Sequence, residues 1–312
     1  MAVVVATGNQ SYQAPFYNEA KAARKEEKHK TSPPSIYRVG ARIGDKYRSM
    51  IAAHRACAGL GPASSITISH SNTRRHDESE LIDDVKGLCS ILAANTCGDF
   101  SCRKYITCVS KEQHELAQNA LFENRGFCLR REPKKVFNNE NGRQEVGVFV
   151  SKGRVPENRL VAIYPGTVYQ PREKAFLQPR GNPFVYRCAD STLIDGNDRA
   201  LSKLTYRSCT LRDRTLPHLM SDMTWLTPIP ANPLAIGQYV DDHPPGASAN
   251  VYCQEINLPL DHFPPPLRRF IPNVPYSNVN GSRTLRMVLL VAMREIKEGE
   301  ELHVKTALMR PA

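Results

Sequence analysis

Two short segments that lie far apart in the chain carry residues that together could bind a cationic ligand. The first is the β-branched run VGVFV, in which Gly147 precedes Phe149 and leaves space for a ligand to approach the backbone. The second segment holds an aromatic residue, two adjacent carboxylates and an amide, namely Tyr239, Asp241, Asp242 and Asn250. Adjacent carboxylates attract a cation but resist burial. Taken singly these residue types do not define a site, because a glycine in a strand is more often a bulge than a ligand contact.

His243 follows the two carboxylates and could serve as a general base. The run PPG directly after it is typical of an exposed turn, and an exposed turn is the preferred interpretation. The sequence therefore assigns no catalytic residue.

Two further segments complete an ordered set of four. The run YPGTVY begins at Tyr164 and contains a Pro-Gly pair that predicts a turn between two strands, while REIKEGEEL ends at Leu302. In this order, from about Gly147 to Leu302, the four segments resemble the SET domain family. The runs GNPFVYRC, LIDGND, NPLAIGQYV and ANV resemble its SET-domain-containing protein 9 subgroup more closely.

The resemblance implies a SET-type protein-lysine N-methyltransferase that uses S-adenosyl-L-methionine and acts on a protein or peptide with a target lysine. The resemblance also implies that the two distant segments form one cofactor pocket, with the binding residues Gly147, Phe149, Tyr239, Asp241, Asp242 and Asn250. Methyl transfer to an amine is an in-line displacement, so such a protein mainly aligns its two ligands. Burial of the substrate lysine lowers its pKa towards the neutral, reactive amine.

Three departures from the family pattern support a second interpretation. Asp241 and Asp242 stand where the family has Asn and His, and the loop from Asp241 to Asn250 is longer. No tyrosine follows Leu302, where the family has one that lines its lysine channel. Asp241 can still accept a hydrogen bond from an ammonium group. The alternative to an enzyme is therefore a non-catalytic SET-fold protein-interaction module.

Composition narrows the range of partners. The net charge of +11 and the pI near 9.3 favour acidic partners such as nucleic acid or chromatin, although the charge is dispersed as on a solvated surface. No run approaches the roughly 18 apolar residues of a membrane span, and no signal peptide is evident. The sequence therefore predicts no membrane partner and an intracellular protein, in the nucleus or the cytoplasm. The spacing of Cys97, Cys102 and Cys108 lacks a C-x-x-C pair, so no metal site is predicted.

The elements that must position these residues belong to an α+β fold, expected as a β-rich SET fold of short strands with a helical N-terminal region. Residues 1–40 are highly charged and then proline-broken, which predicts a disordered basic tail. Residues 41–140 form the helical N-terminal region, in which no chemistry is visible. Residues 141–305 form the SET domain. Its insertions, at about 198–233 and 254–284, are rich in proline and charge and are expected to hold little regular structure beyond a short helix or an edge strand.

Local signals define the expected helices and strands. Asp77 with Glu80, and Ser110 with Gln113, have the spacing of capping boxes, and Gly126 predicts a helix end. The apolar faces of the two helices are Leu81, Val85, Leu88 and Leu92 in the first and Leu116, Ala117, Ala120 and Leu121 in the second. Short β-branched runs predict strands at residues 146–150, 160–164, 184–186, 192–194 and 285–292.

The lone Trp225 and the basic run at residues 207–214 have two interpretations. A basic run beside an aromatic side chain could bind an acidic peptide. A tryptophan packed in the core with solvated arginines nearby is commoner, and it is the preferred interpretation.

Overall fold

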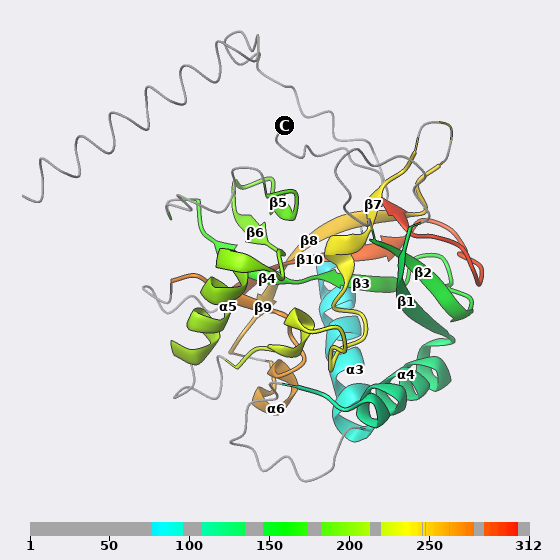
Figure 1. The fold of residues 1–312 in the computed structure, drawn as a ribbon, viewed down its shortest axis with the longest axis horizontal. Helices are drawn as coiled ribbons and strands as arrows, with labels where there is room; N and C mark the ends of the chain where they lie inside the picture. Colours follow the sequence, from blue (N-terminus) through cyan, green and yellow to red (C-terminus); the bar gives the residue numbers. More distant parts are fainter. Residues whose placement is uncertain are drawn as a thin grey trace, which may run out of the picture. The chain divides into compact units, whose positions relative to one another are not determined.

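The computed structural model describes residues 76–95, 108–134, 146–171, 173, 182–212, 220–244, 246, 248–261, 263–277 and 284–304. The chain divides into two compact units, Met1–Ser69 and His70–Ala312, and every described residue belongs to the second unit. The tail predicted over residues 1–40 lies outside the described residues, as do Cys97 and Cys102. The second unit combines a few helices with many short strands (Figure 1), which confirms the predicted α+β class.

Two helices at the start of the described chain pack against each other, as their apolar faces predict. α3 (Glu78–Asn95) buries all four expected residues of its face. α4 (Lys111–Arg125) begins at Ser110, which exchanges hydrogen bonds with Gln113 in the predicted capping box, and Gly126 ends it with a φ of 81°. One residue differs from the prediction. Leu116 was assigned to the buried face from its spacing, but it is 53% exposed.

The largest sheet has five strands in the order β3-β10-β8-β11-β7. The antiparallel pair β8 (Val251–Pro259) and β10 (Thr284–Ala292) forms its centre, and β3 (Leu160–Tyr164) lies at one edge. The short strand β11 (His303–Val304) is parallel to both of its neighbours, β8 and β7 (Asp241–Asp242). Since β7 and β8 follow each other in the chain, their connection must pass across the inserted strand β11.

Two smaller sheets and several short helices surround this one. β1 (Phe127–Pro133) pairs with β2 (Val146–Gly153) in an antiparallel ribbon. The third sheet, in the order β5-β6-β4-β9, contains β5 (Val185–Arg187), β6 (Leu193–Asp195), β4 (Gly166–Tyr169) and β9 (Asn273–Pro275). The short helices are η4 (Thr224–Leu226), η5 (Gly237–Tyr239) and α6 (Pro265–Arg268). All five predicted strand segments fall on strands, namely β2, β3, β5, β6 and β10.

Three regions differ from what their local sequence predicted. The region interpreted as helical, residues 41–140, also contains β1. Residues 198–233 contain the 13-residue helix α5 (Ala200–Arg212), and residues 254–284 contain most of the central strand β8. The cause is the same in each case, because these runs are locally polar and only their tertiary partners favour regular structure. α5 packs on β4 and β9 (Figure 1), and β8 lies between β10 and β11.

A second, small core lies beneath α5. It consists of Tyr206, Cys209, Met223, Trp225, Leu226, Ala235 and Val274. The side chain of Trp225 is 1% exposed, and its ring meets that of Tyr206 edge-on with 4.9 Å between centroids. The packed interpretation of the lone tryptophan is therefore confirmed.

Candidate functional site

The described chain ends in a segment that joins the two halves of the predicted pocket. This terminal segment, residues 299–304, makes backbone hydrogen bonds with β2 on one side, from Gly299 N to Val150 O at 2.8 Å and from Leu302 N to Val148 O at 2.8 Å. On its other side, strand β11 pairs with Asp241 and Asp242 in β7. The glycine-bearing strand and the carboxylate-bearing strand are thus brought to the same place by a third element.

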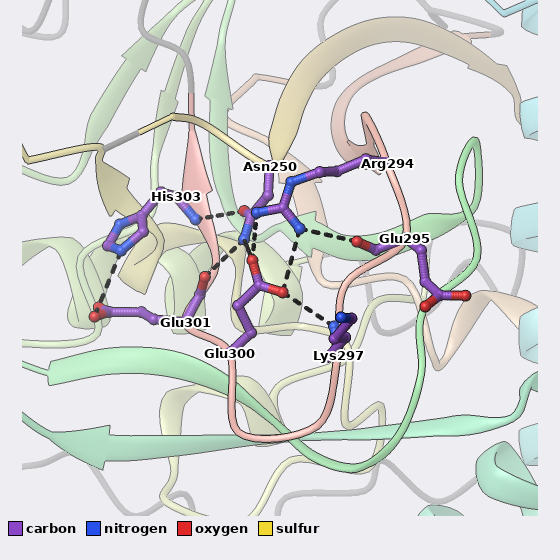
Figure 2. Close-up of polar contacts among 7 residues, drawn as sticks. All are labelled: Asn250, Arg294, Glu295, Lys297, Glu300, Glu301 and His303. Atoms are coloured by element: carbon purple, nitrogen blue, oxygen red, sulfur yellow. Dashed lines mark hydrogen bonds and ion pairs between the residues drawn. The ribbon is translucent and has the colours of Figure 1, made fainter. Parts of the chain in front are cut away.

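Asn250 fixes the terminal segment in position (Figure 2). Its side chain is 1% exposed, its Nδ2 donates to the carbonyl oxygen of Glu301 at 2.8 Å, and its Oδ1 accepts from His303 N at 2.8 Å. The backbone continues the contact, since Asn250 N donates to His303 O at 2.9 Å. An amide has both the donor and the acceptor that a passing strand requires, whereas a carboxylate would have only acceptors.

An ion pair closes the turn that leads into the terminal segment. Figure 2 shows Arg294 paired with the carboxylate of Glu300, which also accepts from Lys297 N at 3.1 Å. The hydrogen bond from Arg294 is the main cause that holds the pKa of Glu300 below its usual range, and partial burial opposes it. Glu300 therefore stays ionised and keeps the turn shut in the neutral pH range.

The charged centre of the site is the ammonium group of Lys134, which directly follows β1. Its Nζ lies 2.9 Å from Oδ2 of Asp241 and 2.7 Å from Oε1 of Glu301. Partial burial lowers the pKa of Lys134, but the hydrogen bonds to Glu301 and Asp241 outweigh it and place the pKa above its usual value. Gly147 lies directly against this group, because a Cβ built on it would be 3.0 Å from Cε of Lys134 and would collide with Oε1 of Glu301.

The other predicted residues take different places around this centre. Phe149 is half-buried and forms an antiparallel bridge with Glu301. Asp242 is exposed, next to Asp241 on the same short strand. The structure therefore brings Gly147, Phe149, Asp241, Asp242 and Asn250 together along the terminal segment.

Tyr239 belongs to an aromatic group beside this centre rather than to the ion-paired centre itself. Its hydroxyl donates to Oδ2 of Asp198 at 2.8 Å, and its ring meets Phe184 edge-on at 5.9 Å. The guanidinium of Arg131, on β1, lies 4.8 Å from the centre of the same ring. Burial and then the nearby charge of Asp198 raise the pKa of Tyr239 to about 12, so the hydroxyl stays a donor. The described contacts of Tyr239 are thus with Asp198, Phe184 and Arg131.

Two members of the site, Lys134 and Glu301, were not found from the sequence. Lys134 lies in a region where no chemistry was visible, and nothing in its local sequence indicates that it contacts a strand formed more than a hundred residues later. Glu301 belongs to the run REIKEGEEL, which was used as a motif without a role for its acids; two acids before a strand are the signal that could have found it. His303 lies with Nε2 3.7 Å from Oε2 of Glu301, an ion pair only when the ring is protonated.

His243 is exposed, as the exposed-turn interpretation predicts.

One further cluster has metal-ligand residue types. Among the described residues, Cys188, Asp190 and Glu255 place one ligand atom each within 4.8 Å of one another. Arg286 already lies between the two acids, at 2.6 Å from Asp190 and 3.6 Å from Glu255. Burial raises the pKa of the Cys188 thiol, so it is not a thiolate. A resident guanidinium and a protonated thiol make this cluster a structural ion pair rather than a metal site.

The predicted resemblance to the SET domain family is confirmed by comparison with known proteins. Over 156 residues, which are 50% of this chain, the sequence is 53% identical to SET domain-containing protein 9 of Homo sapiens and of Pongo abelii. These residues cover 52% of the human protein and 56% of the Pongo abelii protein, so the chain spans about half the length of the curated relatives it matches.

Two other comparisons add less. No protein-family model matches the sequence. The crystal structure of CpSET8 from Cryptosporidium aligns with 87% of this chain and 96% of its own at 11% identity and a TM-score of 0.31, a likeness too weak to support an inference. Among the described residues, no helix has both the length and the apolar character that crossing a bilayer requires.

Proposed function

We propose that this chain is a SET-type protein-lysine N-methyltransferase that uses S-adenosyl-L-methionine. The observation that carries the proposal is the ammonium of Lys134, held by Asp241 and Glu301 directly against Gly147. An α-amino acid end, such as that of S-adenosyl-L-methionine, presents the same kind of ammonium group. The 53% identity to SET domain-containing protein 9 supports the choice of this cofactor among ligands with an ammonium.

The residues present fit the amino-acid end of that cofactor. Asp241 and Glu301 supply acceptors for an ammonium, and Gly147 supplies a backbone that carries no side chain of its own. Both carboxylates are partly exposed, with side-chain exposures of 32% and 21%, so a ligand can reach them from solvent. When bound, S-adenosyl-L-methionine supplies a methyl group activated by its sulfonium.

The substrate lysine is proposed to lie on the aromatic side of η5. Tyr239 and Phe184 offer apolar surface to the aliphatic part of a lysine side chain. Gln238, at 4% exposure, has a side-chain amide with no hydrogen-bond partner among the described residues. A buried amide without a partner is costly, and an amine would satisfy its oxygen. Burial in such surroundings lowers the pKa of the lysine towards the neutral form that can accept a methyl group.

A binding and transfer experiment tests the proposal. Isothermal titration of the folded protein with S-adenosyl-L-methionine is expected to give saturable heat, and S-adenosyl-L-homocysteine should compete. Incubation with a lysine-peptide array and a cofactor carrying a labelled methyl group should then label specific peptides. If the folded protein gives no saturable heat at millimolar cofactor, the proposed methyltransferase function is excluded.

Cofactor binding without any transfer would favour the alternative, an interaction module of the same fold. Two variants sharpen this distinction by placing a tyrosine at the distance from Leu302 that the family uses, Lys305→Tyr and Thr306→Tyr. Transfer gained in either variant indicates an enzyme that needs this hydroxyl. Absence of methyl transfer in both variants, despite cofactor binding, indicates the interaction module.

A further inference from the structure

The open face of Gly147 is already covered by side chains of the same chain. Glycine in a strand commonly marks a place where another group approaches the backbone closely. Here the approaching groups are Cε of Lys134, 3.0 Å from where a Cβ would stand, and the carboxylate of Glu301. A ligand that uses this face of Gly147 must therefore displace at least one of them.

The ammonium of Lys134 also engages the acceptors that a ligand ammonium would use. Its Nζ lies within 2.9 Å of both Asp241 and Glu301, and its side chain is 18% exposed. The same two oxygens cannot bond two ammonium groups at full strength, and two like charges only a few ångströms apart repel each other. Lys134 remains protonated at neutral pH, since its contacts raise its pKa.

We propose that Lys134 is an internal competitor that occupies the ammonium subsite and leaves it when the cofactor binds. This inference rests on the proposed function, because it concerns the same site. The exchange is feasible since partly exposed ion pairs contribute little to stability, and lysine is a flexible chain that can place its charge in nearby water. This competition sets the cofactor concentration at which the site fills, and the ammonium of Lys134 keeps the two carboxylates paired until the cofactor binds.

Removal of the competing charge is the direct test. Lys134→Met keeps a flexible apolar side chain and removes the ammonium, so S-adenosyl-L-homocysteine should bind about fivefold more tightly, the factor that corresponds to one partly exposed ion pair. Lys134→Arg retains a cation beside the two carboxylates and should therefore bind S-adenosyl-L-homocysteine more weakly than Lys134→Met does. Lys152→Met is the matched control, since Lys152 lies over the ring of Phe122 at 3.8 Å and should not affect binding.

A second ligand separates competition from a general change of the pocket. Methylthioadenosine has the adenosine and sulfur but no amino-acid end, so its affinity should be the same in Lys134→Met and in the wild type. Chemical acetylation of Lys134 in the wild type can be monitored by peptide mass spectrometry. It should be slow without ligand, when the ammonium is ion-paired, and faster at saturating S-adenosyl-L-homocysteine, when the ammonium is displaced.

The outcomes distinguish the inference from the proposed function. Tighter binding only of the ligand with an ammonium, or binding seen only after Lys134→Met, supports the competitor. Equal or weaker binding by Lys134→Met, in a wild type that does bind, overturns it and leaves the proposed function intact. Absence of binding in both proteins overturns both.

Discussion

The terminal segment and the core beneath α5 lie in the same unit and hold their polar groups in opposite ways. At the terminal segment, three charges share partly exposed contacts, and a lysine with a long chain provides the only cation of that triad. Beneath α5, Asp222 is 1% exposed, and its Oδ1 accepts from the backbone and hydroxyl of Thr224 at 2.7 and 2.6 Å. The difference indicates that the first region can exchange partners, whereas the second one stabilises the fold.

Truncation of the aromatic centre of the second region should have the largest effect. Trp225→Ala removes a side chain that is 1% exposed and packs on Tyr206, so it should lower the free energy of unfolding by about 3–5 kcal/mol. Cofactor affinity, measured below the new melting temperature, should stay near the wild-type value. Urea unfolding provides the first measurement and titration provides the second. Loss of affinity in a folded variant would contradict the separation of the two regions.

Asp222 should make the free energy of unfolding depend on pH. Burial is the main cause that raises its pKa to about 6 from 3.8, and the hydrogen bonds from Thr224 oppose it. The folded state therefore holds the proton more tightly, so this contribution is fully present below pH 3.8 and is lost as the pH rises through about 6. The loss is on the order of 3 kcal/mol.

In Asp222→Asn the side chain is neutral at every pH, so the free energy of unfolding should not fall as the pH rises through about 6. The amide oxygen can still accept the hydrogen bonds from Thr224. Urea unfolding of the wild type and the variant at several pH values between 4 and about 8 gives the difference. Parallel curves would show that Asp222 is not a buried acid with a raised pKa.

Release of the terminal segment should have a smaller effect on stability and a larger one on the site. Asn250→Ala leaves the carbonyl of Glu301 and the N–H of His303 without their side-chain partners, which should cost about 2 kcal/mol. Because the same segment carries Glu301, cofactor affinity should fall as well. Hydrogen exchange of the amides of His303 and Leu302 should accelerate. Unchanged exchange would mean that other contacts suffice to hold β11.

The sequence predicted the elements whose signals are local. The capping box at Ser110 and the strand at residues 160–164 appear in the structure because short-range patterns determine them. β8 was missed because only its first three residues form an apolar run, and residues 254–259 open a stretch rich in proline and charge that was interpreted as an insertion. β11 has only two residues, and no local pattern can define a strand that short.

The candidate site was predictable in part for the same reason. Gly147, Asp241 and Asn250 lie in runs that carry a motif, and the structure brings them to one place. The described contacts of Asn250 hold the terminal segment, and its cofactor-binding role stays a prediction. Lys134 has no motif, and only the pairing of β1 with β2 carries it to Asp241. Contacts of this kind depend on topology, which single-residue patterns do not contain.

The most direct test of the central claim compares two neighbouring charge reversals, Asp241→Lys and Asp242→Lys. Both change the net charge by the same amount, but only Asp241 contacts the ammonium subsite, whereas Asp242 is exposed beside it. Titration with S-adenosyl-L-methionine should show a loss of affinity of more than about tenfold for Asp241→Lys and little change for Asp242→Lys. Equal affinities of the two folded variants would contradict the claim that Gly147 and Asp241 form one pocket.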